Sequence, residues 1–452
     1  MLTPRLRAEF RETARLAAPL VLGQLSAIGM NVVDTLLAGH YNASTLAAVA
    51  VGTSVWSLAI VTAIGVMLAL PPSVAHLAGA GAGERERIGA LFRQALWLAI
   101  VLGVVLFVGA RHAEPLLRAI GIDAAIIADT QKFLRAISWG APALTGYFAL
   151  RGFSEGLGLT RPTMYFGFLG LVLLAPIGYV LMYGALGLPA RGAQGSGMAT
   201  ALVLWLQLLA FATYIARRGH YVRFAPFARF DWPQPALIFD LLRLGVPMGI
   251  SLFMEASLFI VAALLIGSLG AQAVAGHQIA INVASVAFML PLGVAMATTV
   301  RVGRAAGAGD HEEVRYAGYV GIATSLATQL LSCTIMALFP HAIAAAYTAD
   351  ADVAAFAAQL LLLAAVFQFS DGIQVTASGA LRGLKDTAAP MAITTLAYWG
   401  IGMPVGWWLA FRAGFGARGM WIGMIAGLTV AAALLSMRFA RITQRQRSIA
   451  TA

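Results

Sequence analysis

Three carboxylic acids lie inside apolar segments, far from the polar ends of those segments. They are Asp34, Glu255 and Asp371. A charged acid at the centre of a bilayer costs about 2.5–3.5 kcal/mol on insertion scales, so each position is a functional site by default. The other acidic residues fall in loops, in the tails or near segment ends. No Lys or Arg lies at comparable depth, so we expect no buried basic partner for these three acids.

An acid without a basic partner can bind a proton or a cation. Desolvation and clustering both favour the neutral form of a carboxylic acid, which makes Asp34, Glu255 and Asp371 candidate cation- or proton-binding residues. A cation such as Na⁺, or an organic cation, can take the place of the proton. A site that holds the coupling ion in one conformation and the substrate in another exchanges the two, which is the chemistry of an antiporter.

Polar side chains at helical spacing accompany the three acids. Such groups also tie transmembrane helices together, so for the Asn, Gln and Ser residues packing is as good an interpretation as function. For the one histidine among them, structural hydrogen bonding is favoured over a proton relay. The predicted supporting polar residues are Asn31, Ser251, His277, Gln278, Asn282, Gln368 and Gln374.

The segments that carry these residues are too apolar for a soluble protein. Hydrophobic residues make up 60% of the chain and charged residues 11%, with a mean hydropathy of +0.82, whereas soluble domains have about 25% charged residues. Apolar runs of about 20 residues span the hydrocarbon core as helices, because barrel strands would alternate. We therefore predict an all-α membrane protein with twelve transmembrane helices. The predicted spans are 16–38, 46–70, 89–110, 127–149, 163–186, 192–215, 241–266, 274–300, 314–338, 354–380, 388–410 and 416–438.

The distribution of basic residues predicts the orientation. The net charge is +11, and most of the 30 Lys and Arg residues lie in the tails and in the loops on the same side as the tails. The positive-inside rule places both termini in the cytoplasm, as expected of a multi-pass protein of a bacterial inner membrane. The basic charge is thus a topology signal, and we expect no nucleic-acid partner. Cys333, the single cysteine, permits no disulfide framework.

The first half of the chain resembles the second half in a single register. When Arg15 is laid on Arg243, Pro19 falls on Pro247, and later Gly and Glu residues also coincide without a gap. Two parallel copies of six helices are an architecture of secondary transporters, with the site near midplane. The predicted parts are an N-terminal lobe (1–218), a cytoplasmic inter-lobe linker (219–240) and a C-terminal lobe (241–452), the two lobes being pseudo-symmetric.

Missing motifs narrow the function further. There is no GxxxxGK[ST] phosphate loop, and the seven histidines are scattered, so neither ATP-driven pumping nor a metal-dependent membrane enzyme is indicated. We expect no cofactor other than the coupling ion. The alternatives to an antiporter are a lipid-linked saccharide flippase, an intramembrane enzyme and a channel. A flippase would be expected to have basic residues inside its cavity, and an enzyme would need a nucleophile and base or a metal cluster.

Four blocks of sequence carry a family resemblance. They are Met30–Thr35 with its acid, Pro247–Glu255, Ala275–Ala280, and the long block Phe367–Thr387. Through these blocks the chain resembles the multidrug and toxin extrusion (MATE) family, in its NorM-like branch, over nearly its whole length.

The resemblance implies a fold of two six-helix lobes and a secondary active multidrug efflux antiporter. Such a protein exports cationic or amphipathic drugs and toxins in exchange for H⁺ or Na⁺, as a monomer in the lipid bilayer. The family's cation-site roles would fall on Glu255 and Asp371, and a protonation role on Asp34. Some relatives have a tyrosine one turn before the last acid, whereas Phe367 has no hydroxyl. This departure favours H⁺ over Na⁺.

Overall fold

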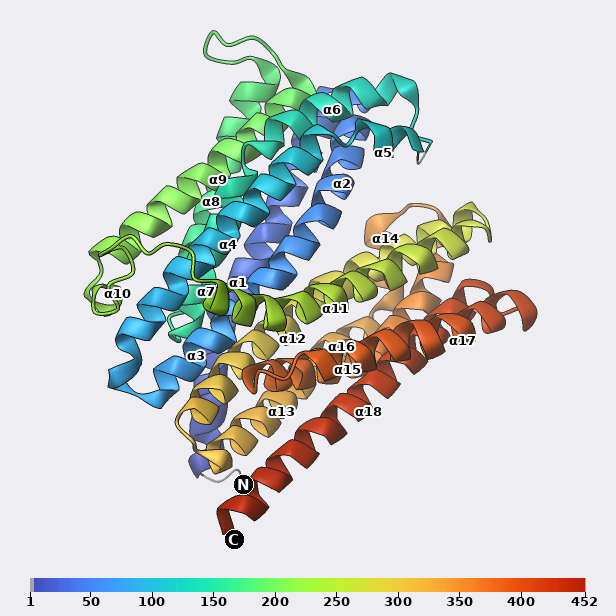
Figure 1. Ribbon diagram of the computed structural model, residues 1–452. Helices are drawn as coiled ribbons and strands as arrows, with labels where there is room; N and C mark the ends of the chain where they lie inside the picture. The colour runs from blue at the N-terminus through green and yellow to red at the C-terminus, as the bar shows by residue number, and fades with distance from the viewer. Residues whose placement is uncertain (1–3, 120, 452) are drawn as a thin grey trace. The chain divides into compact units, whose positions relative to one another are not determined.

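Every regular element of the described chain is helical. The structure is a computed structural model that describes residues 4–119 and 121–451, and Figure 1 shows its helices as long rods. The helices are α1 (Pro4–Tyr41), α2 (Ala43–Met67), α3 (Leu70–Ala80), η1 (Ala82–Glu84), α4 (Arg85–Arg111), α5 (Glu114–Ala119), α6 (Ala124–Ser138), α7 (Ala141–Gly156), α8 (Arg161–Tyr183), α9 (Gly192–Arg217), α10 (Gly219–Val222), α11 (Pro235–Gly267), α12 (Ala271–Gly307), α13 (His311–Leu338), α14 (Pro340–Tyr347), α15 (Ala351–Gly383), α16 (Ala388–Thr395), η2 (Leu396–Gly402), α17 (Met403–Trp407), η3 (Trp408–Arg412) and α18 (Gly416–Thr451).

The predicted spans are found as helices, but two of them are irregular. Ten helical stretches of the described chain are long and apolar enough to cross a membrane. The predicted span 127–149 is divided between α6 and α7, which meet at Gly140 with Pro142 in the first turn of α7. The predicted span 388–410 is helical throughout, but it alternates between α-helical and π-helical turns around Pro404. Proline removes a backbone donor, and a wider turn is one way for a helix to absorb that loss. The predicted fold class is confirmed.

The described helices form two compact units. One unit, here called the N unit, is Leu22–Gly249, and the other, here called the C unit, is Met1–Val21 with Ile250–Ala452. Two helices, α1 and α11, therefore begin in one unit and end in the other. The compact units divide the chain elsewhere than the predicted lobes, whose boundaries follow the helix repeat and stay a prediction.

Close backbone contacts explain why α1 and α11 divide where they do. In the N unit, a Cβ on Gly65 of α2 would lie 2.2 Å from the Cα atom of Gly249 on α11. In the C unit, a Cβ on Gly293 of α12 would lie 2.4 Å from the Val21 side chain. Glycine at these crossings lets one helix lie directly against another.

The N unit keeps the inter-lobe linker tied to α4. Arg93 donates from Nε to the Asp231 carboxylate at 2.6 Å, and Trp97 donates from Nε1 to the Asp231 carbonyl at 2.9 Å. The hydrogen bond from Arg93, helped by the charges of Arg93 and Arg229, holds the pKa of Asp231 below its ordinary value. The segment between α10 and α11, residues 223–234, is therefore ordered against its own unit, and we call it the strap.

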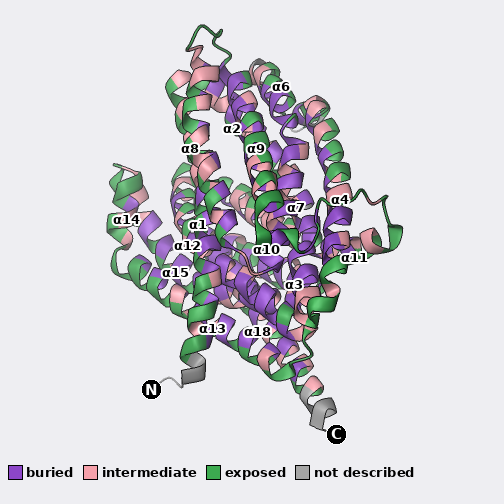
Figure 2. Ribbon diagram, turned by 90° about the vertical axis from the view of Figure 1, so that its left-hand side faces the viewer, coloured by how far each residue is buried: buried purple, intermediate pink, exposed green. Residues whose placement is uncertain are grey.

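The C unit is built on a row of packed helices. In it α12 packs on α13 and α15, and α15 packs on α18, as Figure 1 shows. Trp421, Tyr398 and Phe367 are buried at its centre. Figure 2 shows buried residues along the packed faces and exposed residues on the outward faces of the helices. Those outward faces carry large apolar side chains such as Leu264, which is 71% exposed, as expected where helices meet lipid.

Candidate functional site

Asp34 is held between hydroxyl groups in the N unit. The side chain is 9% exposed. Ser196 donates to its Oδ1 atom at 2.8 Å and Thr200 donates to its Oδ2 atom at 3.0 Å. The two donors are one turn apart on α9, so a single face of that helix serves both carboxylate oxygens. No basic side chain of the described chain forms an ion pair with Asp34, as the sequence led us to expect.

Asp371 is buried in the C unit with one carboxylate oxygen unpaired. It lies on α15, is 4% exposed, and has an Oδ1 atom that is fully buried without a hydrogen bond to the described residues. One turn later, the Oε1 atom of Gln374 is in the same condition. Buried polar atoms normally have partners, since leaving one unpaired costs about 1–3 kcal/mol. Two unpaired oxygens one turn apart make this part of α15 a candidate binding position.

Glu255 on α11 belongs to the same region as Asp371. The two acids interact electrostatically, and Glu255 also interacts with the guanidinium of Arg382. That guanidinium folds back along α15, donating from Nε to the Ser378 carbonyl at 3.3 Å and from Nη2 to the Val375 carbonyl at 3.4 Å.

Arg382 corrects one expectation from the sequence. Its backbone lies in the last turn of α15, which placed it among loop residues by position alone. Its long side chain reaches inward, because an arginine can carry its charge several ångströms from its Cα. Glu255 therefore has a basic group within electrostatic reach, although the two do not form an ion pair.

Tyr398 supplies a hydroxyl that the sequence did not indicate. Its Oη atom is buried without a hydrogen-bond partner among the described residues, and this phenol group interacts electrostatically with both Glu255 and Asp371. Tyr398 stands in the π-helical segment η2. Phe367 offers no hydroxyl, but the phenol of Tyr398 comes from another helix. We call Glu255, Asp371, Arg382 and Tyr398 the acid cluster.

The predicted polar residue Gln368 has a packing role. Its Nε2 donates to the Ala284 carbonyl of α12 at 2.8 Å, and its Oε1 accepts from Gln329 of α13 at 2.6 Å. The amide thus ties three helices together. His277 is also buried, with its ring 5.8 Å from that of Trp421 and its Nδ1 atom without a partner among the described residues.

The remaining predicted polar residues are not brought into the acid cluster. Gln278 and Asn282 lie one turn apart on an exposed face of α12, and Asn31 is exposed on α1. Ser251 is half-buried one turn before Glu255. The roles of these side chains in binding stay predictions.

The N unit contains a buried ion pair that sequence reasoning placed outside the membrane region. Arg151 donates from Nε to Glu155 at 2.6 Å and from Nη2 to Gln24 at 3.0 Å, and Thr163 donates to the same carboxylate at 3.1 Å. The predicted span ended at residue 149, whereas α7 continues to Gly156. The spacing of four residues between Arg and Glu was the available signal.

A preformed multidentate metal site is not part of this arrangement. Within residues 4–119 and 121–451, no three His, Cys, Asp or Glu side chains come together as metal ligands. The chemistry that the two groups of acids support is reversible binding of a proton or a single cation by carboxylates in a low-dielectric environment.

Comparison with known proteins decides the family. The MatE family model matches residues 19–180 and again residues 247–408. The chain belongs to the MATE family. The first match begins at Pro19 and the second at Pro247, which is the register in which the sequence of this MATE chain repeats, and the two matches are of equal length.

Curated relatives and solved structures agree with this assignment. The chain is 51% identical to the probable multidrug resistance protein NorM of Xanthomonas campestris pv. campestris, over 98% of this chain and 96% of the relative. It is 42% identical to the multidrug resistance protein PmpM of Pseudomonas aeruginosa, over 98% and 93%. The fold matches an outward-facing multidrug resistance MATE transporter with a TM-score of 0.89 at 21% identity, covering 97% of both chains. MATE proteins are multi-pass membrane transporters that handle small molecules.

Proposed function

We propose that this MATE-family multidrug efflux transporter is an antiporter that exports cationic or amphipathic drugs in exchange for protons. The observation that carries the proposal is Asp371, a buried carboxylate with an unpaired oxygen next to Glu255 and Tyr398. A buried carboxylate with an unpaired oxygen can bind a proton or another mobile cation. Competition between a proton and a drug for such groups couples their movements in opposite directions.

The proton is favoured over Na⁺ by Phe367, which offers no hydroxyl ligand one turn before Asp371. The charge of Arg382 does not distinguish the two ions, because it opposes any added positive charge at Glu255, a proton included. The alternative coupling ion is Na⁺ held by Glu255 and Asp371, and the uptake assay below distinguishes coupling to Na⁺ from coupling to protons.

In the proposed exchange, both units bind protons, but with different partners. Asp34 keeps its orientation through Ser196 and Thr200 whether or not it is protonated, because each hydroxyl can donate or accept. The unpaired Oδ1 atom of Asp371 gains a hydrogen-bond partner only when a ligand binds. A protonated site no longer attracts a cationic drug, so proton entry promotes drug release. A membrane potential adds about 2.3 kcal/mol per charge moved per 100 mV.

We also propose the cellular setting. The chain is a monomer in a bacterial inner membrane, with both termini and the strap around Asp231 in the cytoplasm. The arginines of the strap and the tails support this orientation. The protein moves its substrate without changing it chemically, in keeping with the transporter family to which it belongs.

The test is transport into energised inverted membrane vesicles. Ethidium should accumulate in vesicles containing the wild-type chain, collapse with an uncoupler, and persist when Na⁺ is removed. Asp371→Asn removes the titratable group and should lower uptake by more than tenfold. Asp352→Asn is the matched control, because Asp352 is exposed in the first turn of the same helix. This variant should transport ethidium at the wild-type rate.

Two outcomes would overturn the proposal. Uptake by Asp371→Asn at the wild-type rate would remove the role of the acid. Uptake that requires Na⁺ and ignores the uncoupler would replace the proton by Na⁺ as the coupling ion.

A further inference from the structure

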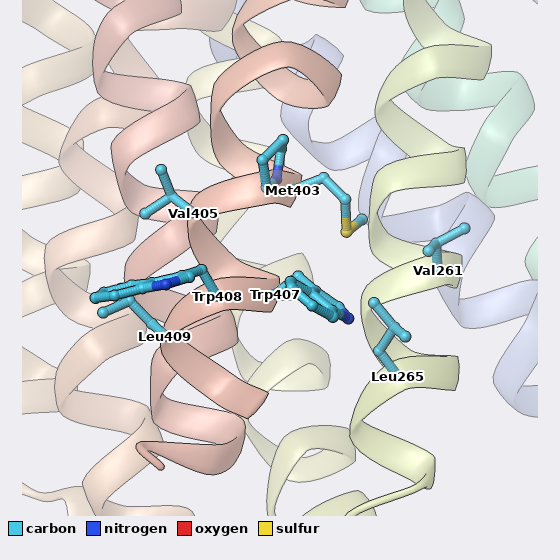
Figure 3. Close-up of a pocket in the computed structure, with 8 residues that line it drawn as sticks. Val261, Leu265, Met403, Val405, Trp407, Trp408 and Leu409 are labelled. Atoms are coloured by element: carbon cyan, nitrogen blue, oxygen red, sulfur yellow. The ribbon is translucent and has the colours of Figure 1, made fainter. Parts of the chain in front are cut away.

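An open groove lies on the C unit between α11 and the helix that runs from α16 to η3. Its volume is about 840 Å³, within the roughly 300–1,000 Å³ typical of ligand pockets. In Figure 3, Leu265 projects from α11 toward Trp407 on the opposite helix, and Met403 points from that helix toward α11. The lining residues are Val261, Leu265, Met403, Pro404, Val405, Trp407, Trp408 and Leu409.

The groove is open because the helix opposite α11 is drawn toward α18. A Cβ on Gly423 of α18 would lie 2.2 Å from the Cα of Gly406, and a Cβ on Gly427 would lie 2.9 Å from the Cα of Gly402. These glycines lie four residues apart on each helix and form the contact, so the bulky side chains of the helix from α16 to η3 lie on its other faces. The indole of Trp407 faces α11 across the groove and lies 6.2 Å from the ring of Phe411 on its own helix.

Two tryptophans at the groove suit a membrane interface. Trp407 is 43% exposed and Trp408 is 57% exposed. Tryptophan is enriched at the level of lipid headgroups, where its ring is apolar and its N–H can donate a hydrogen bond. The rest of the lining is aliphatic or sulfur-containing, which suits an acyl chain.

An exposed arginine lies close to the two tryptophans of the groove. Arg412 is one turn beyond Trp408, and its guanidinium lies 5.9 Å from the centre of the Trp407 ring. Its side chain forms no hydrogen bond or ion pair with any residue of the described chain. An arginine placed over an indole and lacking a carboxylate is well suited to bind a phosphate.

We propose that this groove binds one anionic phospholipid, with an acyl chain between Leu265 and Trp407 and the headgroup phosphate on Arg412. The charge of Arg412 selects the occupant, because a cationic drug would be repelled from the same position. In the proposed orientation the headgroup lies in the outer leaflet. This site is separate from the acid cluster and does not depend on the antiport proposal.

The test compares lipid binding by the full-length chain in mild detergent. Native mass spectrometry during titration with phosphatidylglycerol and with phosphatidylcholine counts the lipids bound per chain. The wild type should hold one phosphatidylglycerol more tightly than phosphatidylcholine. Arg412→Gln should weaken phosphatidylglycerol binding about fivefold, the effect of removing one basic residue at an anionic lipid surface. It should weaken phosphatidylcholine binding less, because the choline group of that lipid already offsets the charge of its phosphate.

Two further variants complete the experiment. Arg118→Gln removes the same charge from an exposed arginine that pairs with Glu114 in the N unit, and it should bind lipid as the wild type does. Trp407→Leu should weaken both lipids, since the indole lines the groove. Equal binding of phosphatidylglycerol by Arg412→Gln and the wild type would overturn the proposal. So would a wild type that holds the two lipids equally well.

Discussion

Asp34 and Asp371 are buried acids in opposite conditions. Asp34 has a hydroxyl donor on each oxygen, whereas Asp371 has an unpaired oxygen and a second acid, Glu255, nearby. The donors of Asp34 come from α9, so that helix and α1 must keep their register for the site to exist. The hydroxyls therefore act by positioning the acid and by offering it hydrogen bonds in either protonation state.

Removing one hydroxyl tests this role at Asp34. Thr200→Val keeps the shape of the side chain and removes the donor to Oδ2. Because a hydrogen bond to a charged group contributes about 1.5–3 kcal/mol, we expect ethidium uptake at low substrate concentration to fall roughly tenfold. The measurement is the initial uptake rate in inverted vesicles.

The matched control for Thr200 is Thr213→Val on the same helix. The Thr213 hydroxyl is exposed and donates only to the Leu209 carbonyl of its own helix, so uptake should be unchanged. If both variants transported equally, Asp34 would not depend on its hydroxyl donors.

Among the elements, the helix from α16 to η3 shows how small residues place a functional group. Its glycines lie against α18, and its π-helical segment η2 carries Tyr398 toward the acid cluster. Inserted turns of this kind re-aim the side chains that follow them. The same element thus positions one hydroxyl of the acid cluster and one wall of the apolar groove.

Substitution of Gly423 tests that packing. In Gly423→Ala the new methyl would lie 2.2 Å from the Gly406 Cα, a backbone atom that cannot move alone. We expect a loss of stability of about 1–3 kcal/mol, typical of overpacking, seen as a lower thermal unfolding midpoint in detergent.

Gly400→Ala is the control for the packing experiment. An added Cβ at Gly400 would meet no atom within 4 Å, so the midpoint should stay or rise slightly. A Gly423→Ala midpoint equal to that of Gly400→Ala would show that the helices can separate without cost.

Sequence reasoning located the elements better than it located the groups within them. Long apolar runs predicted the spans, because lipid requires continuous helices of set length. The break at Gly140 and the π-helical turns leave no comparable signal in hydropathy. Arg382 was missed because its guanidinium lies far from its Cα position. Tyr398 was missed because it lies on a different helix from both acids. The three acids stood out in the sequence, since a buried carboxylate is rare enough to notice.

At the scale of the whole molecule, one duplicated scaffold carries two kinds of chemistry. The two MatE matches set Pro19 against Pro247, and in that register the position equivalent to Asp34 is Ala262, which is fully buried in the core of the C unit. The halves therefore share helix packing and differ in their acids. The linker between them is ordered through Arg93 and Asp231 on α4, so its attachment belongs to the stability of the whole chain.

That attachment should depend on pH. The pKa of Asp231 is lowered by Arg93, so its ionised form stabilises the folded state above the ordinary value of 3.8 and loses this effect as pH falls through the lower folded value. Asp231→Asn should therefore lower the thermal unfolding midpoint at pH 7, and the difference from the wild type should shrink below about pH 4. Asp240→Asn, an exposed acid near the start of α11 in the same unit, is the control for a general loss of charge. Equal midpoints of Asp231→Asn and the wild type at pH 7 would mean that the carbonyl contact with Trp97, which both chains keep, and not the ion pair, holds the strap.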